Sequence, residues 1–233
     1  MRVWIAPVAL FVLVFVFLVV PEFAQDSTQK DSSSSSSRSK KTPKALAKTG
    51  LDDGKVSAGV YRNASLSLTC QIPAGWVLRT VEMNTRDSDG DQNQNLSPQG
   101  SQGATGENNS GRVLLAAFSR PPQAKGEDVN SSIVIAAEPV AAYPGLTEAL
   151  QYVGPLTEVA KAQGFETDED PYEVAIGPKT LVQVDFHKNV GSRVMRQSTL
   201  IFLARGYAVS ITVIGGTEDE VGDLVEGLSF ASK

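Results

Sequence analysis

Apolar and polar side chains alternate with a period of two in several stretches of this 233-residue chain. Successive side chains of a strand point to opposite faces, so this alternation is typical of strands with one buried face. The pattern is clearest in residues 65–72 and 207–214. Its apolar positions are Leu66, Leu68, Cys70 and Ile72 in the first stretch and Tyr207, Val209, Ile211 and Val213 in the second. The chain is therefore expected to build a β-sheet.

Further strands are predicted from composition and turns. Residues 112–118 and 132–137 are apolar at successive positions, which suits central strands that are covered on both faces. Strands are also predicted at 172–176, 180–187 and 194–204, where glycine-containing turns link neighbouring segments into hairpins.

Two segments have helical patterns. Residues 145–164 carry apolar side chains three and four positions apart, and Pro155 is expected to kink this helix or divide it. Thr217 and Glu220 have the spacing of a capping box and begin a last helix that runs to about Gly227. Hairpin-linked strands with two helical regions predict the α+β class, an antiparallel β-sheet flanked by helices.

The run YRNASLSLTCQIPAGW, residues 61–76, resembles the opening of the PsbP-like family, which has a Tyr-x-Asn start, an apolar strand and Pro-x-Gly-Trp. The later order of elements is similar and ends in the Leu-x-Phe of Leu228 and Phe230, so the resemblance spans about residues 61–230. It implies an α-β-α sandwich, a fold shared with a Ran-binding import factor. Plant and cyanobacterial members assist photosystem II and many bacterial members are exported, but the resemblance implies no catalytic residue.

The N-terminus is typical of an exported protein. Residues 3–20 carry no charge and follow Arg2, so this run is expected to enter the membrane with its basic end on the cytoplasmic side. Its length lies between that of a secretory apolar core and that of a membrane-spanning helix, and Ala24 suits a cleavage site. Residues 1–24 are therefore a signal peptide or an N-terminal membrane anchor, and both remain open.

Composition divides the remainder of the chain. Residues 25–55 are rich in Ser and Lys and poor in large apolar groups, so they are expected to form a disordered tether. Residues 56–233 are expected to form a single domain. A polar, glycine-rich insertion at about 84–111 is expected to be disordered within it.

Charge narrows the expected partners. The segment 26–55 has seven Lys and Arg against four Asp, whereas residues 56–233 carry a net charge of −8. An acidic domain repels phosphates, which argues against nucleic acid as a partner. The expected partners are an envelope protein and, through an uncleaved N-terminal segment, the membrane.

The candidate ligand or partner surface lies on one strand. His187, the only histidine, shares the polar face of residues 180–187 with Asp185 and Gln183. A carboxylate beside an imidazole can orient a general base, but no nucleophile is near in sequence. Cys70, the only cysteine, lies on the apolar side of its strand, where a buried thiol is typical. Its use as a nucleophile would require His187 within hydrogen-bond reach.

Metal and cofactor sites have little support. Asp87, Asp89 and Asp91 alternate as at the start of a calcium loop. Positions six and twelve of that loop are Gln92 and Pro98 instead of Gly and Glu, which leaves only weak calcium candidates. One histidine and one cysteine exclude the common zinc sites, and the usual nucleotide-binding motifs are absent. No metal and no cofactor is therefore expected.

Two further groups of polar residues are ambiguous. One is an acidic cluster formed by Glu166, Asp168, Glu169 and Asp170. This cluster is either solvated or faces a cation or a basic partner. Asn-x-Ser/Thr triplets, which matter only where exported proteins are glycosylated, begin at Asn63, Asn108 and Asn130.

The sequence thus predicts an exported, non-catalytic accessory or binding module, periplasmic or anchored to the cytoplasmic membrane and facing outward. Enzymatic activity is not favoured, but it stays open. One alternative is a hydrolase or thiol enzyme that uses Cys70 and His187. Another is a structural protein tethered in the envelope, which predicts a domain without a concave binding site.

Overall fold

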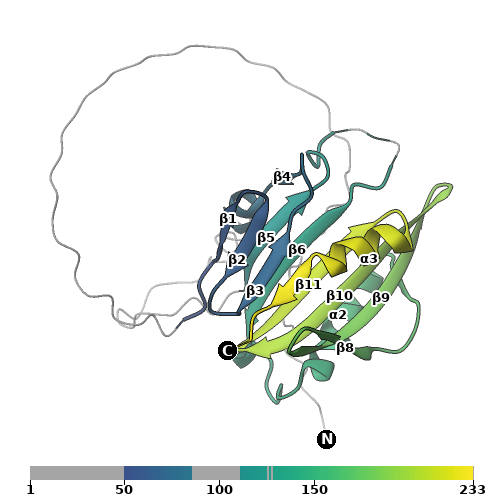
Figure 1. The fold of residues 1–233 in the computed structure, drawn as a ribbon. Coiled ribbons are helices and arrows are strands. Elements are labelled where there is room, and N and C mark those ends of the chain that lie inside the picture. The colour runs from purple at the N-terminus through teal and green to yellow at the C-terminus, as the bar shows by residue number, and fades with distance from the viewer. Residues whose placement is uncertain (1–49, 86–110, 125, 127, 233) are drawn as a thin grey trace, which may run out of the picture.

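A computed structural model describes residues 50–85, 111–124, 126 and 128–232 of the chain (Figure 1). The predicted signal peptide or anchor, the tether as far as residue 49 and most of the predicted insertion, 86–110, lie outside these residues. Among the residues that the structure describes, no helix is long and apolar enough to cross a membrane.

Most strands join one antiparallel, eight-stranded sheet. Its main path runs β4-β5-β6-β11-β10-β9-β7, and β8 also pairs with β9. The strands are β4 (Val77–Leu78), β5 (Arg112–Phe118), β6 (Ser132–Pro139), β7 (Glu166–Thr167), β8 (Tyr172–Ile176), β9 (Lys179–Val190), β10 (Arg193–Ala204) and β11 (Tyr207–Gly215). The hairpins that join β9 to β10 and β10 to β11 confirm the turns predicted from the sequence.

Each face of the large sheet buries a separate apolar core. On one face, Leu181, Leu200 and Ile211 pack with residues of β5 and β6. On the other face, Val184 and Phe186 pack with α2 (Ala149–Ala162). Because adjacent positions of β9 enter different cores, the sheet is the middle layer of the domain.

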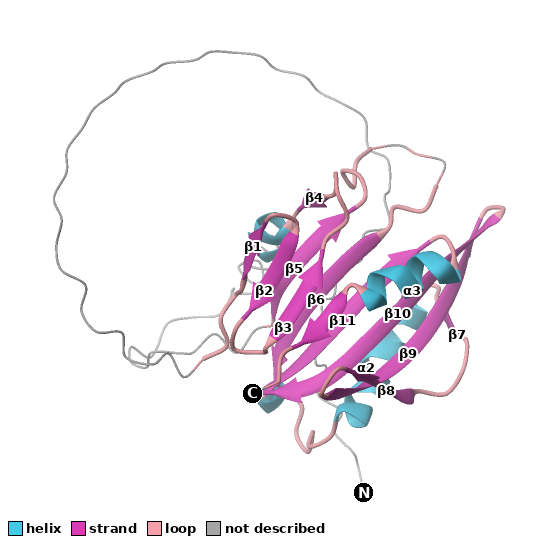
Figure 2. Cartoon of the chain, viewed as in Figure 1, coloured by secondary structure: helices cyan, strands magenta, loops and turns pink. Residues whose placement is uncertain are grey.

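A second, four-stranded sheet covers much of the first face (Figure 2). Its order is β1-β2-β3-β12, formed by β1 (Lys55–Ser57), β2 (Val60–Asn63), β3 (Leu68–Gln71) and β12 (Leu228–Phe230). The side chains that it contributes to the core are Tyr61, Leu68, Cys70, Leu228 and Phe230. This small sheet therefore packs against the large sheet like one half of a sandwich.

The predicted α-β-α sandwich is wrong, because a sheet takes the place of one of its helical layers. The small sheet lies beside α3 (Glu218–Glu226) on one side of the large sheet, and α2 lies on the other side (Figure 2). Of the strands of the small sheet, only β3 lies in a stretch with a clear alternation, whereas β1 and β12 have three residues each, too few to show a period. In addition, β12 lies near the C-terminus and pairs with β3, which is far from it in sequence, so no local sequence pattern predicts this contact.

Helix ends are set by local chemistry. The Thr217 side chain accepts a hydrogen bond from the Glu220 amide at 3.1 Å, which confirms the predicted start of α3. The Glu220 carboxylate accepts from the Gly216 amide at 2.8 Å and from the Ser131 hydroxyl, so it ties the start of α3 to the residue that precedes β6. Pro155 lies inside α2 without dividing it. A 3-10 turn, η1 (Val140–Ala142), precedes α2, and residues 80–85 are also helical.

The described fold begins before the domain boundary predicted at residue 56. Leu51 is only 5% exposed and belongs to the core beneath the small sheet. Lys55 already lies in β1. Residues 50–55 are thus packed onto the domain, and this segment forms one wall of the site described next.

Candidate functional site

The residues predicted as a ligand surface, Gln183, Asp185 and His187, lie side by side on β9. The Asp185 carboxylate accepts hydrogen bonds from the Gln183 amide at 3.0 Å, from the Tyr172 hydroxyl at 2.7 Å and from the Ser198 hydroxyl. Burial and the adjacent Asp185 carboxylate raise the pKa of Tyr172. These contacts hold β8, β9 and β10 together, and they occupy the carboxylate that would otherwise face a ligand.

His187 is paired in the same way. Its Nδ1 contacts the Asp168 carboxylate, and its Nε2 lies 3.7 Å from a Glu166 oxygen. Arg196, directly opposite on β10, pairs with Glu218 at 3.0 Å. Within the described part of the chain, the imidazole contacts these two carboxylates, so the cluster binds its own members.

Cys70 is a core residue of the small sheet. Its side chain is fully buried, and its sulfur contacts the Gln71 carbonyl oxygen at 3.6 Å. Burial raises the pKa of the Cys70 thiol to about 12, so the thiolate needed for nucleophilic attack is nearly absent at neutral pH. The geometry therefore gives no support to a thiol enzyme that uses Cys70 and His187.

The other sequence candidates lie only partly within the described residues. The calcium candidates Asp87, Asp89 and Asp91, like the triplet at Asn108, lie outside the described residues. Over residues 50–85 and 111–232, apart from 125 and 127, no three His, Cys, Asp or Glu side chains are grouped as metal ligands would be. Asn63 is 1% exposed and fully hydrogen-bonded, so its triplet is inaccessible in the folded domain.

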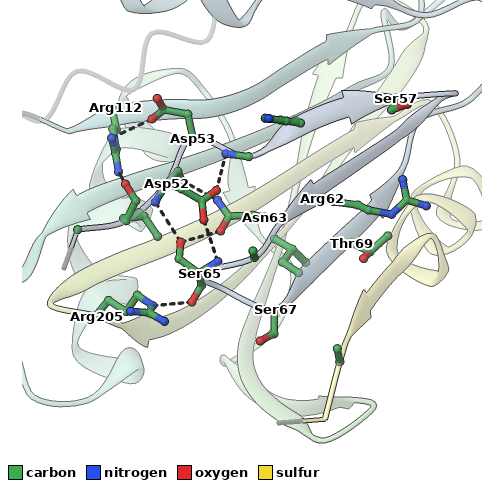
Figure 3. Close-up of a pocket in the computed structure, with 17 residues that line it drawn as sticks. Asp52, Asp53, Ser57, Arg62, Asn63, Ser65, Ser67, Thr69, Arg112 and Arg205 are labelled. Atoms are coloured by element: carbon green, nitrogen blue, oxygen red, sulfur yellow. Dashed lines mark hydrogen bonds and ion pairs between the residues drawn. The ribbon is translucent and has the colours of Figure 1, made fainter. Parts of the chain in front are cut away.

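An open groove of about 1260 Å³ lies beside the small sheet, and residues 50–54 line one side of this groove (Figure 3). Its polar lining is mostly basic and hydroxylic, with Lys55, Ser57, Arg62, Thr69, Arg112 and Arg205. A concave surface argues against the alternative of a purely structural spacer, which predicts none.

One wall of the groove is held by a network centred on Asn63. The Asn63 amide donates to the Asp52 carbonyl at 2.7 Å, and its oxygen accepts from the Ser65 hydroxyl at 2.8 Å and the Leu66 amide at 3.0 Å. The Asp52 carboxylate accepts from the Gly54 and Ser65 amides at 2.8 and 2.9 Å. Although partial burial acts in the opposite direction, these hydrogen bonds lower the pKa of Asp52. The network fixes residues 51–54 against the turn between β2 and β3.

Gly54 is required where this wall meets the core. Its φ of +71° is in the left-handed region, and a Cβ at this position would lie 2.5 Å from the Tyr61 ring. The Tyr61 hydroxyl donates to the Asp53 carbonyl at 3.1 Å, and burial raises its pKa to about 12. Only glycine lets the chain pass this ring, and the path brings Lys55 into β1.

On the outer face of the small sheet, basic and hydroxyl side chains form a row across all four strands. Lys55 lies directly opposite Arg62, Arg62 opposite Thr69, and Thr69 opposite Ser229. Like charges directly opposite each other destabilise a sheet. Neither Lys55 nor Arg62 forms an ion pair with a residue of the described chain. We call Lys55, Arg62, Thr69 and Ser229 the cationic row.

The two nearby arginines are already engaged. Arg112 donates to the Asp53 carboxylate at 2.8 Å and to the Leu51 carbonyl, and the Arg205 Nε donates to the Ser65 carbonyl at 2.6 Å. They brace the groove wall, while Lys55 and Arg62 are exposed to solvent. Sequence reasoning missed this row because Lys55 reads as part of the tether, and the pairing of β1 with β2 places it opposite Arg62.

Comparison with known proteins shows no family. No family model matches the chain, and no curated protein matches it. One similar solved structure is a Pseudomonas aeruginosa protein of unknown function, with 17% identity, TM-score 0.32, and coverage of 55% of this chain and 78% of that one. Another is LpqN, involved in cell envelope biogenesis of Mycobacterium tuberculosis, with 11% identity, TM-score 0.33, and coverage of 71% and 83%. A Bacteroides thetaiotaomicron structure has 10% identity, TM-score 0.32, and coverage of 71% and 46%. These similarities are too low to carry a functional argument, and the kinship with PsbP-like proteins stays a prediction.

Proposed function

We propose that this protein is an exported, non-catalytic binding module that recognises an anionic ligand on the small sheet. The observation that carries the proposal is the pair Lys55 and Arg62, two exposed cations held opposite each other without an anionic partner among the described residues. An anion bound between them would relieve the repulsion that the empty pair imposes on the sheet.

The remainder of the surface supports binding rather than catalysis. His187 and Asp185 are occupied by neighbouring side chains, and Cys70 is a buried, protonated thiol. Export is supported by the uncharged run at residues 3–20 behind Arg2. The protein would then act in the envelope, either released or held by its N-terminal segment.

The test uses the full chain in a neutral detergent, titrated with inorganic phosphate and with a soluble polyanion, and followed by NMR or calorimetry. We expect weak, salt-sensitive binding that K55E/R62E abolishes. The matched control, K161E/R193E, changes the net charge equally but lies on α2 and β10, and it should bind like the unmodified protein. Binding that is unaffected by K55E/R62E, or no binding of any anion, would refute the proposal.

A further inference from the structure

We propose that the cationic row docks on anionic phospholipid headgroups, so that the outer face of the small sheet lies against the membrane. This inference rests on the proposed anion-binding function and names its ligand. It commits to the phosphodiester groups of a lipid surface because of three features of the structure: the shape of the row, its charge, and the point at which the chain enters the fold.

The shape of the row suits an extended surface. It crosses all four strands of the small sheet, and a strand spacing of about 4.8 Å gives it a length of about 14 Å. Two neighbouring cations are followed here by the hydroxyl groups of Thr69 and Ser229, which can hydrogen-bond phosphate oxygens that the cations attract. Such a row on a solvent-facing sheet can meet several headgroups at once, whereas a single small ligand would contact only part of it.

Charge favours this face over the opposite side of the domain. Of the acidic residues beside the row, Asp53 is paired with Arg112, and the Asp52 carboxylate accepts from two backbone amides. The far edge of the large sheet, in contrast, carries exposed Glu166, Asp170 and Glu173 around β7 and β8. On the same side of the large sheet as the row, α3 also carries exposed Glu218, Asp219, Asp223 and Glu226. An anionic bilayer would attract the cationic row and repel both α3 and the far edge, so the contact is confined to the outer face of the small sheet.

The chain enters the fold close to the cationic row. Gly50 lines the groove and is five residues before Lys55. Residues 21–49 join it to the apolar run, and these 29 residues span at most about 100 Å when fully extended. If the run is retained, the connection keeps the row at a high effective concentration near the headgroups, so that weak ionic contacts suffice.

The experiment measures orientation rather than bulk binding, because the apolar run can hold the full chain on vesicles by itself. A fluorophore is placed on Ser57→Cys, on the same face as Lys55, or on Glu158→Cys, on α2. The native Cys70 is buried and should not react, so each variant carries one label. The full chain is reconstituted into phosphatidylcholine vesicles with or without phosphatidylglycerol, and quenching by headgroup-labelled nitroxide lipid is recorded.

We expect phosphatidylglycerol to increase quenching of the label at Ser57→Cys, and the label at Glu158→Cys to remain unquenched. The change should disappear in K55E/R62E, persist in K161E/R193E, and decrease with added salt. The loss of two positive charges alone is expected to reduce the docked population about 25-fold, at roughly fivefold per charge, and the two carboxylates that K55E/R62E adds should reduce it further.

Two outcomes would overturn the inference, and they differ in what they say of the proposed function. Equal quenching at both positions in anionic vesicles, together with binding of inorganic phosphate that needs Lys55 and Arg62, would show a site for soluble anions and not for lipid. Equal quenching without binding of any anion would refute both the lipid inference and the proposed function.

Discussion

Replacing Asn63 with alanine is expected to destabilise the domain, because it removes the centre of the hydrogen-bond network of the groove wall. The side chain is 1% exposed and makes four hydrogen bonds, to the Asp52 carbonyl, the Tyr61 hydroxyl, the Ser65 hydroxyl and the Leu66 amide. A typical intramolecular hydrogen bond contributes about 1 kcal/mol net, which sets an upper sum of about 4 kcal/mol. Water can reach the exposed Asp52 in the variant, so we expect a loss of about 3 kcal/mol.

The free energy of unfolding would be measured on the full chain in neutral detergent, by urea titration followed with far-UV circular dichroism. For a domain of this size, a loss of about 3 kcal/mol corresponds to a fall in Tm of roughly 6–12 °C. Asn130→Ala is the matched control. Asn130 makes three hydrogen bonds in a half-buried loop and should lose only about 1–2 kcal/mol.

Hydrogen exchange adds a second measurement. Because the Asn63 side chain pins the Leu66 amide and residue 52, Asn63→Ala should also increase exchange at Leu66 and across residues 51–54. A loss of less than 1 kcal/mol, or equal effects for Asn63→Ala and Asn130→Ala, would refute the view that this side chain organises the groove wall.

Three other predictions concern the helices and the buried titratable groups. Thr217→Ala removes the cap of α3 and should cost about 1 kcal/mol, measured by urea titration, whereas Thr217→Asp should retain most of the stability. Because burial raises the pKa of the Cys70 thiol to about 12, alkylation at pH 8 should be slow in the native protein and fast in urea, and equal rates would contradict the burial. Burial also raises the pKa of Glu138, although the Tyr143 hydroxyl donates to it and acts in the opposite direction. The stability that Glu138 contributes is therefore present at pH 4 and lost as the pH rises through its folded pKa. Glu138→Gln should consequently be more stable than the unmodified protein at pH 8. Unfolding curves recorded at pH 4 and at pH 8 should show this difference.

Local sequence patterns predicted one part of the candidate site but not the other. The common face of Gln183, Asp185 and His187 follows from alternation along one strand, and the structure places them so. Their partners come from β7, β8 and β10, and whether a polar group is free or satisfied depends on those partners. The cationic row depends on pairing between strands, so the sequence of any single segment does not predict it.

Much of the fold was within reach of the amino-acid sequence alone. Long strands such as β9 and β11, the turns between them and the capped start of α3 each depend on residues close together in the chain. Periodicity and capping express these local preferences directly. The core position of Cys70 follows in the same way from its place in an alternating stretch.

Only the tertiary structure decided what covers the large sheet and where the open charges lie. The strands β1 and β12 have three residues each, too few to show a pattern, and each becomes a strand because a partner strand supplies its hydrogen bonds. Pairing of β1 with β2 turned Lys55 from a tether residue into the neighbour of Arg62. Burial and strand pairing are properties of the whole chain, because the free energy of these short strands comes from contacts that the sequence separates and folding brings together.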